Sequence, residues 1–100
     1  MADKNYTVDL SGVTTKEQLH AALKEGLSLP DYYGGNLDAL HDCLGELAAS
    51  GTPEEPVTIT FTGYKTARKS LVRDFYSFRN VIEDMAEEAD NLSIAWRRRK

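Results

Sequence analysis

Two carboxylates spaced by one helical turn are the residues of this sequence whose type and spacing could do chemistry. The segment DYYGGNLDALHDCL, residues 31–44, carries Asp38 and Asp42 just after Asn36, a residue type favoured as a helix N-cap. Residues four apart on a helix have Cβ atoms about 5–6 Å apart, and a like-charge pair there costs about 0.2–0.5 kcal/mol. Such a pair can transfer protons, bind a hard cation, or complement a basic pocket on another protein.

The leucines of the same segment decide between these uses. They recur at helical spacing and predict one buried stripe made of Leu37, Leu40, Leu44 and Leu47. Asp38 and Asp42 fall nearly opposite that stripe, on the solvent side, where no sheltered cleft supports acid–base catalysis. His20, His41 and Cys43 have no metal-ligand spacing, and no Ser-His-Asp order is present. We therefore expect no catalysis, no cofactor and no metal site.

The glycines before this helix admit a second interpretation, an anion cradle. YYGGN precedes a helix N-terminus, where free N–H groups and the helix dipole favour phosphate. The fingerprints of a P-loop and of a dinucleotide site are missing, and the nearby aspartates would repel a phosphate.

Tyr32 and Tyr33, just before the helix, have two interpretations that the sequence leaves open: they are interface anchors or half-buried core aromatics. Tyr32 is expected to be the more exposed of the two.

Charge is unevenly placed along the chain, whose net charge is −4. From Glu25 to Tyr64 there is no Lys or Arg but there are seven acidic residues. Such a region repels nucleic acid and attracts basic partners, unless it is only a solvated acidic surface. The single cysteine, Cys43, fits a reducing compartment. With no apolar run of about 18 residues and no signal-peptide pattern, we expect a cytoplasmic protein without a membrane partner.

The order of expected elements predicts the fold. Alternating segments predict strands at 6–10, 57–62 and 92–96, and 3–4 periodicity predicts helices over 14–26, 37–47, 64–70 and 71–90. Helices separate every pair of strands, so the strands pair in parallel, and their clean alternation leaves one sheet face open. The sequence thus predicts a two-layer α/β domain over residues 1–96, with strand order 1-2-3, all helices on one face and a threonine-bearing open face.

Local signals set the expected element boundaries. Thr14 and Glu17 have capping-box spacing for the first helix, and Gly26 is placed to end that helix in a left-handed conformation. Pro56 argues against a helix near Pro53. The last four residues, RRRK at 97–100, form a basic tail with a weak chance of touching nucleic acid.

The stretch LPDYYGGNLDALHDCL, residues 29–44, closely resembles the barstar family, the small intracellular inhibitors of barnase-type, guanyl-specific ribonucleases. The resemblance is densest at Leu29, Pro30, Tyr32, Tyr33, Gly34, Asn36, Leu37, Asp38, Ala39, Leu40, Asp42, Cys43 and Leu44. It implies three parallel strands with packed helices, in agreement with the fold derived above. It also implies a stoichiometric inhibitor, monomeric when free, without cofactor, whose partner is a basic extracellular-type ribonuclease and not a nucleic acid.

The resemblance assigns roles to residues at matching positions. Asp42 would occupy the place of the substrate phosphate in the ribonuclease, and Asp38 would meet a basic residue at the rim of that site. Tyr32 would stack near the catalytic histidine of the enzyme, and Gly34 would allow close backbone approach. His41 would be a contact or a flanking residue.

An outlying acidic contact is expected on the last helix. Asp84 falls nearest to the family position, and Glu83 or Glu88 are alternatives because the alignment is loose there.

Several departures from the family pattern bear on the identity of the partner. His41 stands where the family often has tryptophan, Gly35 replaces a glutamate, and the loop over 48–55 is longer. These departures leave two targets open, a ribonuclease unlike barnase and a nuclease toxin. The alternative from another class is an acidic protein-binding module that keeps the fold and regulates an unrelated basic protein.

Overall fold

A parallel sheet forms one layer of the molecule in the computed structural model, which describes residues 5–29, 33–89 and 91–97. Its strands are β1 (Asn5–Asp9), β2 (Val57–Thr62) and β3 (Leu92–Arg97), and they lie in the order β1-β2-β3. Both neighbouring pairs are parallel, with Val8 opposite Phe61 and Phe61 opposite Trp96. The structure confirms the predicted sheet and its strand order.

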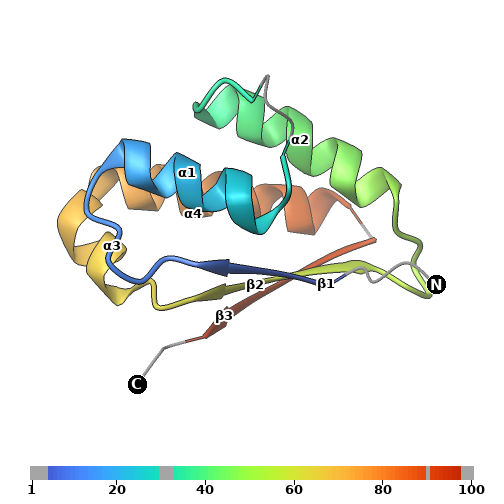
Figure 1. Cartoon of the computed structure of the whole chain (residues 1–100). Helices are drawn as coiled ribbons and strands as arrows, with labels where there is room; N and C mark the ends of the chain where they lie inside the picture. The colour runs from blue at the N-terminus through green and yellow to red at the C-terminus, as the bar shows by residue number, and fades with distance from the viewer. Residues whose placement is uncertain (1–4, 30–32, 90, 98–100) are drawn as a thin grey trace.

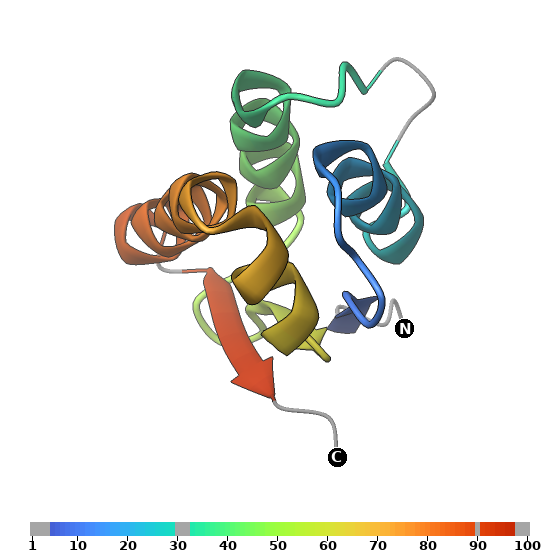
Figure 2. The ribbon, with the colours of Figure 1, turned by 90° about the vertical axis from the view of Figure 1, so that its left-hand side faces the viewer.

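The helices lie on one side of that sheet. They are α1 (Lys16–Gly26), α2 (Leu37–Ala49), α3 (Lys65–Leu71) and α4 (Arg73–Glu88). Figure 1 shows α1, α2 and α4 over the same face, with α3 at one end of the molecule. In Figure 2, α2 lies above α1 and α4, farthest from the sheet, and it packs against α4. This arrangement confirms the predicted α/β fold with helices on one face.

Strand alternation explains why one face is covered. Val57, Ile59 and Phe61 of β2 are completely buried, whereas the threonines between them are partly exposed on the other face. Full burial of such a side chain contributes about 1.5–3 kcal/mol relative to exposure. The fully buried helical residues that complete the core include Leu19, Leu23, Leu40, Leu44, Phe78 and Ile82. The helices are therefore held to the sheet by hydrophobic burial.

The cap of α1 lies one residue later than predicted. Thr15 is the N-cap, and its hydroxyl accepts a hydrogen bond from the Gln18 backbone N–H at 3.1 Å. The Gln18 side-chain oxygen in turn accepts from the Thr14 backbone N–H at 2.7 Å. The capping box predicted at Thr14 and Glu17 is therefore wrong by one position, because Thr15 and Gln18 have the same spacing and spacing alone does not separate the two registers.

The role predicted for Gly26 is also wrong. Gly26 is the last residue of α1, and the residue with positive φ is Ser28, at 53°. A Cβ on Gly26 would come within 2.8 Å of Val8 Cγ2 and 3.0 Å of the Thr7 carbonyl oxygen. Glycine is needed there because α1 and β1 approach closely, and not because the helix ends in a left-handed turn.

The junction of α3 and α4 lies slightly later than the break predicted between residues 70 and 71. Val72 has a φ of 43°, so Leu71 belongs to α3 and α4 begins at Arg73. Over residues 50–56 the chain is irregular, which confirms the prediction that no helix forms near Pro53. The last strand includes Arg97, the first residue of the predicted tail, and residues 98–100 lie outside the described part of the chain.

Candidate functional site

The solvent face of α2 carries the two carboxylates singled out by their spacing. Asp38 and Asp42 are exposed, whereas Leu40 and Leu44 on the opposite side are completely buried. Within the described residues, neither carboxylate makes a hydrogen bond or an ion pair. Both negative charges are therefore presented to whatever approaches this face.

Hydrogen bonds fix α2 at both of its ends. Asn36 is the N-cap, with a φ of −138°, and its side-chain oxygen accepts from the Ala39 backbone N–H at 2.8 Å. This confirms the predicted cap, a type of contact worth about 1 kcal/mol. At the other end, the Asn91 side-chain nitrogen donates to the carbonyl oxygen of Ala48 and, at 3.1 Å, to that of Gly51. We call the exposed side of α2 that carries Asp38 and Asp42 the acidic face. Its helix is thus capped at one end and hydrogen-bonded at the other to the residue that precedes β3.

A tyrosine–histidine contact holds the loop that leads into α2. The Tyr33 hydroxyl lies 2.6 Å from His20 Nδ1 on α1, and the two rings are tilted by 50° with centroids 5.8 Å apart. Burial raises the pKa of Tyr33 to about 12. Burial, and then the charge of Lys16, lowers the pKa of His20, against an opposing effect of Glu17. In the neutral tautomer whose proton is on Nε2, His20 Nδ1 accepts the hydrogen bond that the Tyr33 hydroxyl donates.

The two tyrosines of the loop have different outcomes. Tyr33 is half-buried and packs against the core, so the structure selects the core interpretation for this residue. Tyr32 lies outside the described residues, and its interface role stays a prediction.

Two adjacent glycines turn the loop into the helix. Gly35 has a φ of +68°, a conformation that strains other residue types. Gly34 is exposed, and a Cβ there would come 3.3 Å from the Asn36 side-chain nitrogen and 3.7 Å from Ala39 Cβ. A side chain at position 34 would therefore crowd the cap of α2. The sequence singled out Gly34 for close approach, and the structure adds Gly35 as the residue whose backbone makes the turn.

The remaining predicted site residues lie on two helices. His41 is exposed on α2, next to Asp42, and Asp84 is exposed on α4. Of the two alternatives to Asp84, Glu88 is exposed and Glu83 accepts a hydrogen bond from Trp96 Nε1 at 2.7 Å. Glu83 is therefore already used within the fold.

Gly45 lies on the exposed side of α2 near Asp42, and the sequence analysis did not identify it. It follows Asp42 by three positions on α2, it is exposed, and a Cβ built on it would meet no heavy atom within 4 Å. A glycine inside a helix is destabilising by about 0.5–1 kcal/mol relative to alanine. The signal was present in the sequence, as a helical glycine at i+3 from a candidate contact residue.

Cys43 has a structural role. The thiol is buried, and burial raises its pKa, with smaller contributions from the charges of Glu46 and Asp42. A neutral buried thiol behaves as a small apolar side chain.

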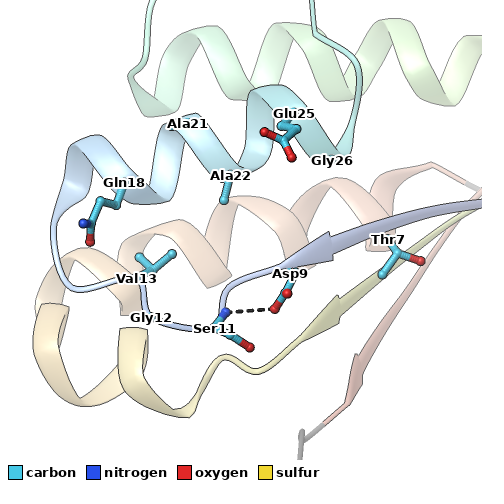
Figure 3. Close-up of a pocket in the computed structure, with 10 residues that line it drawn as sticks. All are labelled: Thr7, Asp9, Ser11, Gly12, Val13, Gln18, Ala21, Ala22, Glu25 and Gly26. Carbon is cyan, nitrogen blue, oxygen red and sulfur yellow. Dashed lines mark hydrogen bonds between the residues drawn. The ribbon is translucent and has the colours of Figure 1, made fainter.

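A hollow of about 450 Å³ lies between α1 and the chain that leads into it from β1 (Figure 3). Its polar groups are spread apart: Gln18 lies near the start of α1 and Glu25 near its end, and Asp9 accepts a hydrogen bond from the Ser11 N–H at 2.9 Å. In the described ranges no group of three or more His, Cys, Asp and Glu side chains is arranged to hold a metal ion. None of the helices there combines the length and the apolar character that crossing a bilayer requires.

Comparison with known proteins covers nearly the whole chain. The family model described as Barstar (barnase inhibitor) matches residues 4–98, which include the acidic face of α2 and the loop before it. A Bacillus subtilis (strain 168) protein named "Putative ribonuclease inhibitor YrdF" is 38% identical over 72 residues, which cover 72% of this chain and 74% of that protein. With its parallel sheet, its helices on one face and its match to the family model, this chain belongs to the barstar family.

Proposed function

We propose that this protein is a stoichiometric, non-catalytic inhibitor of a guanyl-specific, barnase-like ribonuclease or nuclease toxin. The observation that carries the proposal is the pair Asp38 and Asp42, exposed on a capped helix and bound to no described residue. The family description, barnase inhibitor, and the name of the Bacillus subtilis relative support the same class of partner.

The proposed mechanism is mimicry of the RNA backbone. Asp42 enters the phosphate site of the enzyme, and Asp38 pairs with a basic residue at the rim. Tyr32 stacks near the catalytic histidine, and Gly34 lets the loop backbone approach the enzyme. His41 flanks the contact, and Asp84 on α4 makes an outlying contact with another basic residue.

Electrostatics favour such a complex despite its internal cost. The repulsion between Asp38 and Asp42 costs about 0.2–0.5 kcal/mol in the free protein. A desolvated charge at the centre of an interface contributes several times more, and complementary surface charge also accelerates encounter. The net result is affinity gained at a small expense of stability. The proposal includes a cytoplasmic location, which suits the single buried thiol of Cys43.

The test is binding to barnase, measured by calorimetry and by inhibition of RNA cleavage. By analogy with the hot-spot aspartate known in barstar itself, we expect Asp42→Ala to lose on the order of 2–5 kcal/mol of binding free energy. Glu54→Gln removes one negative charge from the exposed loop after α2 and is the control, expected to bind like the wild type. A complex that tolerates Asp42→Ala as well as Glu54→Gln would refute the mimicry mechanism. Failure to bind any guanyl-specific ribonuclease would instead favour an acidic module for an unrelated basic protein.

A further inference from the structure

Residues 65–79, which contain five Lys or Arg side chains, form what we call the basic end of the molecule. This end contains a pocket that the proposed function does not use. We call it the aromatic pocket; it has a volume of about 170 Å³ and is lined by Tyr64, Arg68, Phe75, Arg79 and Trp96. These residues come from α3 and the residue before it, from α4 and from β3. Figures 1 and 2 show α3 and the end of β3 on the side of the molecule away from α2.

The walls of the aromatic pocket are three rings in fixed positions. Tyr64 stacks on Phe75 at a centroid distance of 6.2 Å and meets Trp96 edge-on at 5.7 Å. Trp96 also stacks on buried Phe61 at 4.6 Å and donates its Nε1–H to Glu83. Because these contacts already restrict the rings, a ligand that stacks here loses little side-chain entropy on binding.

Two guanidinium groups flank the rings. The Arg68 Cζ lies 6.0 Å from the Tyr64 ring centroid, and the Arg79 Cζ lies 5.6 Å from that of Trp96. No carboxylate in the described part of the chain forms an ion pair with either arginine. An exposed cation–π contact is worth only about 0.5–1 kcal/mol, so both groups can turn toward an incoming anion.

Positive charge extends beyond the pocket. Residues 65–79 contain five basic side chains, Lys65, Arg68, Lys69, Arg73 and Arg79, and one acidic side chain, Asp74. Tyr76, next to Phe75 on α4, is 67% exposed and adds a solvent-facing ring to this surface. The acidic stretch that repels nucleic acid ends at Tyr64, so the objection that charge raises against RNA applies to α2 and not to this end.

We propose that the aromatic pocket binds single-stranded RNA, with a base on its rings and the neighbouring phosphates on Arg68 and Arg79. Aromatic platforms combined with a cationic groove are the usual means of holding unpaired strands, since every base offers a flat face. An acidic protein segment would satisfy the arginines but supplies no flat ring for the walls. Duplex RNA keeps its bases stacked and paired, and therefore offers only phosphates here.

Trp96 provides the measurement, because it is the single tryptophan of the chain and lines the pocket. Titration of the full-length protein with a uridine octanucleotide should quench tryptophan emission. If two phosphates are contacted, affinity should fall about sevenfold for a fourfold rise in salt. Uridine monophosphate, an RNA duplex, inorganic polyphosphate and polyglutamate are the comparison ligands, each expected to bind at least tenfold more weakly.

Matched variants test the residues. Arg68→Gln/Arg79→Gln should weaken octanucleotide binding at least tenfold, while Lys16→Gln/Lys24→Gln on α1, of equal net charge, should stay within twofold of the wild type. Circular dichroism verifies folding, and single Arg68→Gln and Arg79→Gln variants replace the double variant should it unfold.

Several outcomes would overturn the proposal: no quenching, equal binding of polyphosphate or monophosphate, tighter binding of polyglutamate, or equal loss in both double variants. Inhibition of a ribonuclease should be unchanged in Arg68→Gln/Arg79→Gln. The RNA-binding proposal and the proposed inhibitor function are therefore tested independently of each other.

Discussion

The outer face of α2 and the basic end formed by α3 and the start of α4 differ in both charge and shape. α2 carries Asp38, Asp42 and Glu46 and neither Lys nor Arg, whereas residues 65–79 carry five Lys or Arg residues and one acidic residue. The carboxylates stand on the convex surface of a helix, and the arginines flank a hollow with aromatic walls. A convex acidic surface suits insertion into the cleft of another molecule, while a concave basic surface suits reception of a ligand.

The helix dipoles show how far these charges depart from what stability favours. Asp38 lies in the first turn of α2, where negative charge is favourable by about 0.3–1 kcal/mol at low ionic strength. On α4 the first turn holds both Arg73 and Asp74, and Glu87 and Glu88 lie in a last turn that has no basic residue. Only the acidic last turn of α4 is therefore unfavourable to its helix dipole.

Loss of the whole acidic pair should have the largest effect. We expect Asp38→Ala/Asp42→Ala to weaken binding to the ribonuclease on the order of a thousandfold or more, since central charged contacts dominate such interfaces. Surface plasmon resonance at two salt concentrations would separate the association rate, which steering controls, from dissociation. The basic end provides the comparison, because Arg68→Gln/Arg79→Gln should leave both rates unchanged. Equal losses from the two double variants would mean that the partner does not distinguish the two surfaces.

Loss of the Asn91 hydrogen bonds at the C-terminal end of α2 should have the next largest effect, mainly on stability. Asn91→Ala removes the donor that holds the carbonyl oxygens of Ala48 and Gly51, and should lower the free energy of unfolding by about 1–3 kcal/mol. Urea denaturation measures this loss, with Asn80→Ala on the exposed surface of α4 as the control. Binding should weaken less than in Asp42→Ala, because the carboxylates themselves remain. A free energy of unfolding for Asn91→Ala no lower than that of Asn80→Ala would show that the tether is not needed.

Acid should loosen the loop that leads into the acidic face. The pKa of His20 is lowered from 6.5, so the unfolded chain binds the proton more tightly than the folded chain. The stability that neutral His20 contributes is therefore present above pH 6.5 and is lost as the pH falls through the lowered value. His20→Gln should flatten this acid limb in a series of urea denaturations, and an unchanged limb would contradict the assignment. The effect should be modest because His20 is only partly buried.

Alkali should act on the other half of the same contact. The pKa of Tyr33 is raised from 10.0 to about 12, so the unfolded chain loses its proton first. The corresponding stability is present below pH 10 and is lost as the pH rises toward 12. Tyr33→Phe should remove this alkaline limb, and persistence of the alkaline limb would assign it to another group.

Periodicity and local motifs in the sequence were sufficient to predict the strands, the buried side of α2 and the cap at Asn36. Each of these depends on residues within a few positions of one another. Boundaries were less accurate because neighbouring residues offered equal signals, as with Thr14 and Thr15. Gly26 was misjudged for another reason, because its role depends on the close approach of β1. The positive φ of Val72 was not predicted, since it depends on the direction of the next helix.

Long-range contacts account for the rest of what the sequence did not reveal. The Tyr33–His20 hydrogen bond joins residues 13 positions apart, and the Asn91 tether spans 43 positions to Ala48. The aromatic pocket is assembled from α3, α4 and β3, so no single segment indicates it. In contrast, the acidic face lies on one helix and could be predicted from a single turn of sequence.

Gly45 offers the finest test of where the acidic face ends. Gly45→Ala should raise the free energy of unfolding by about 0.5–1 kcal/mol, because alanine favours the helix and its Cβ meets no heavy atom within 4 Å. Asn80→Ala, a comparable change on α4, should also stabilise the protein but leave binding of the ribonuclease unaltered. If the partner seats closely over α2, the added methyl group at position 45 should weaken binding a few-fold even as stability rises. Unchanged binding in the stabilised variant would instead place the edge of the contact between Asp42 and Gly45. Gly45 would then lower the stability of α2 without contributing to binding.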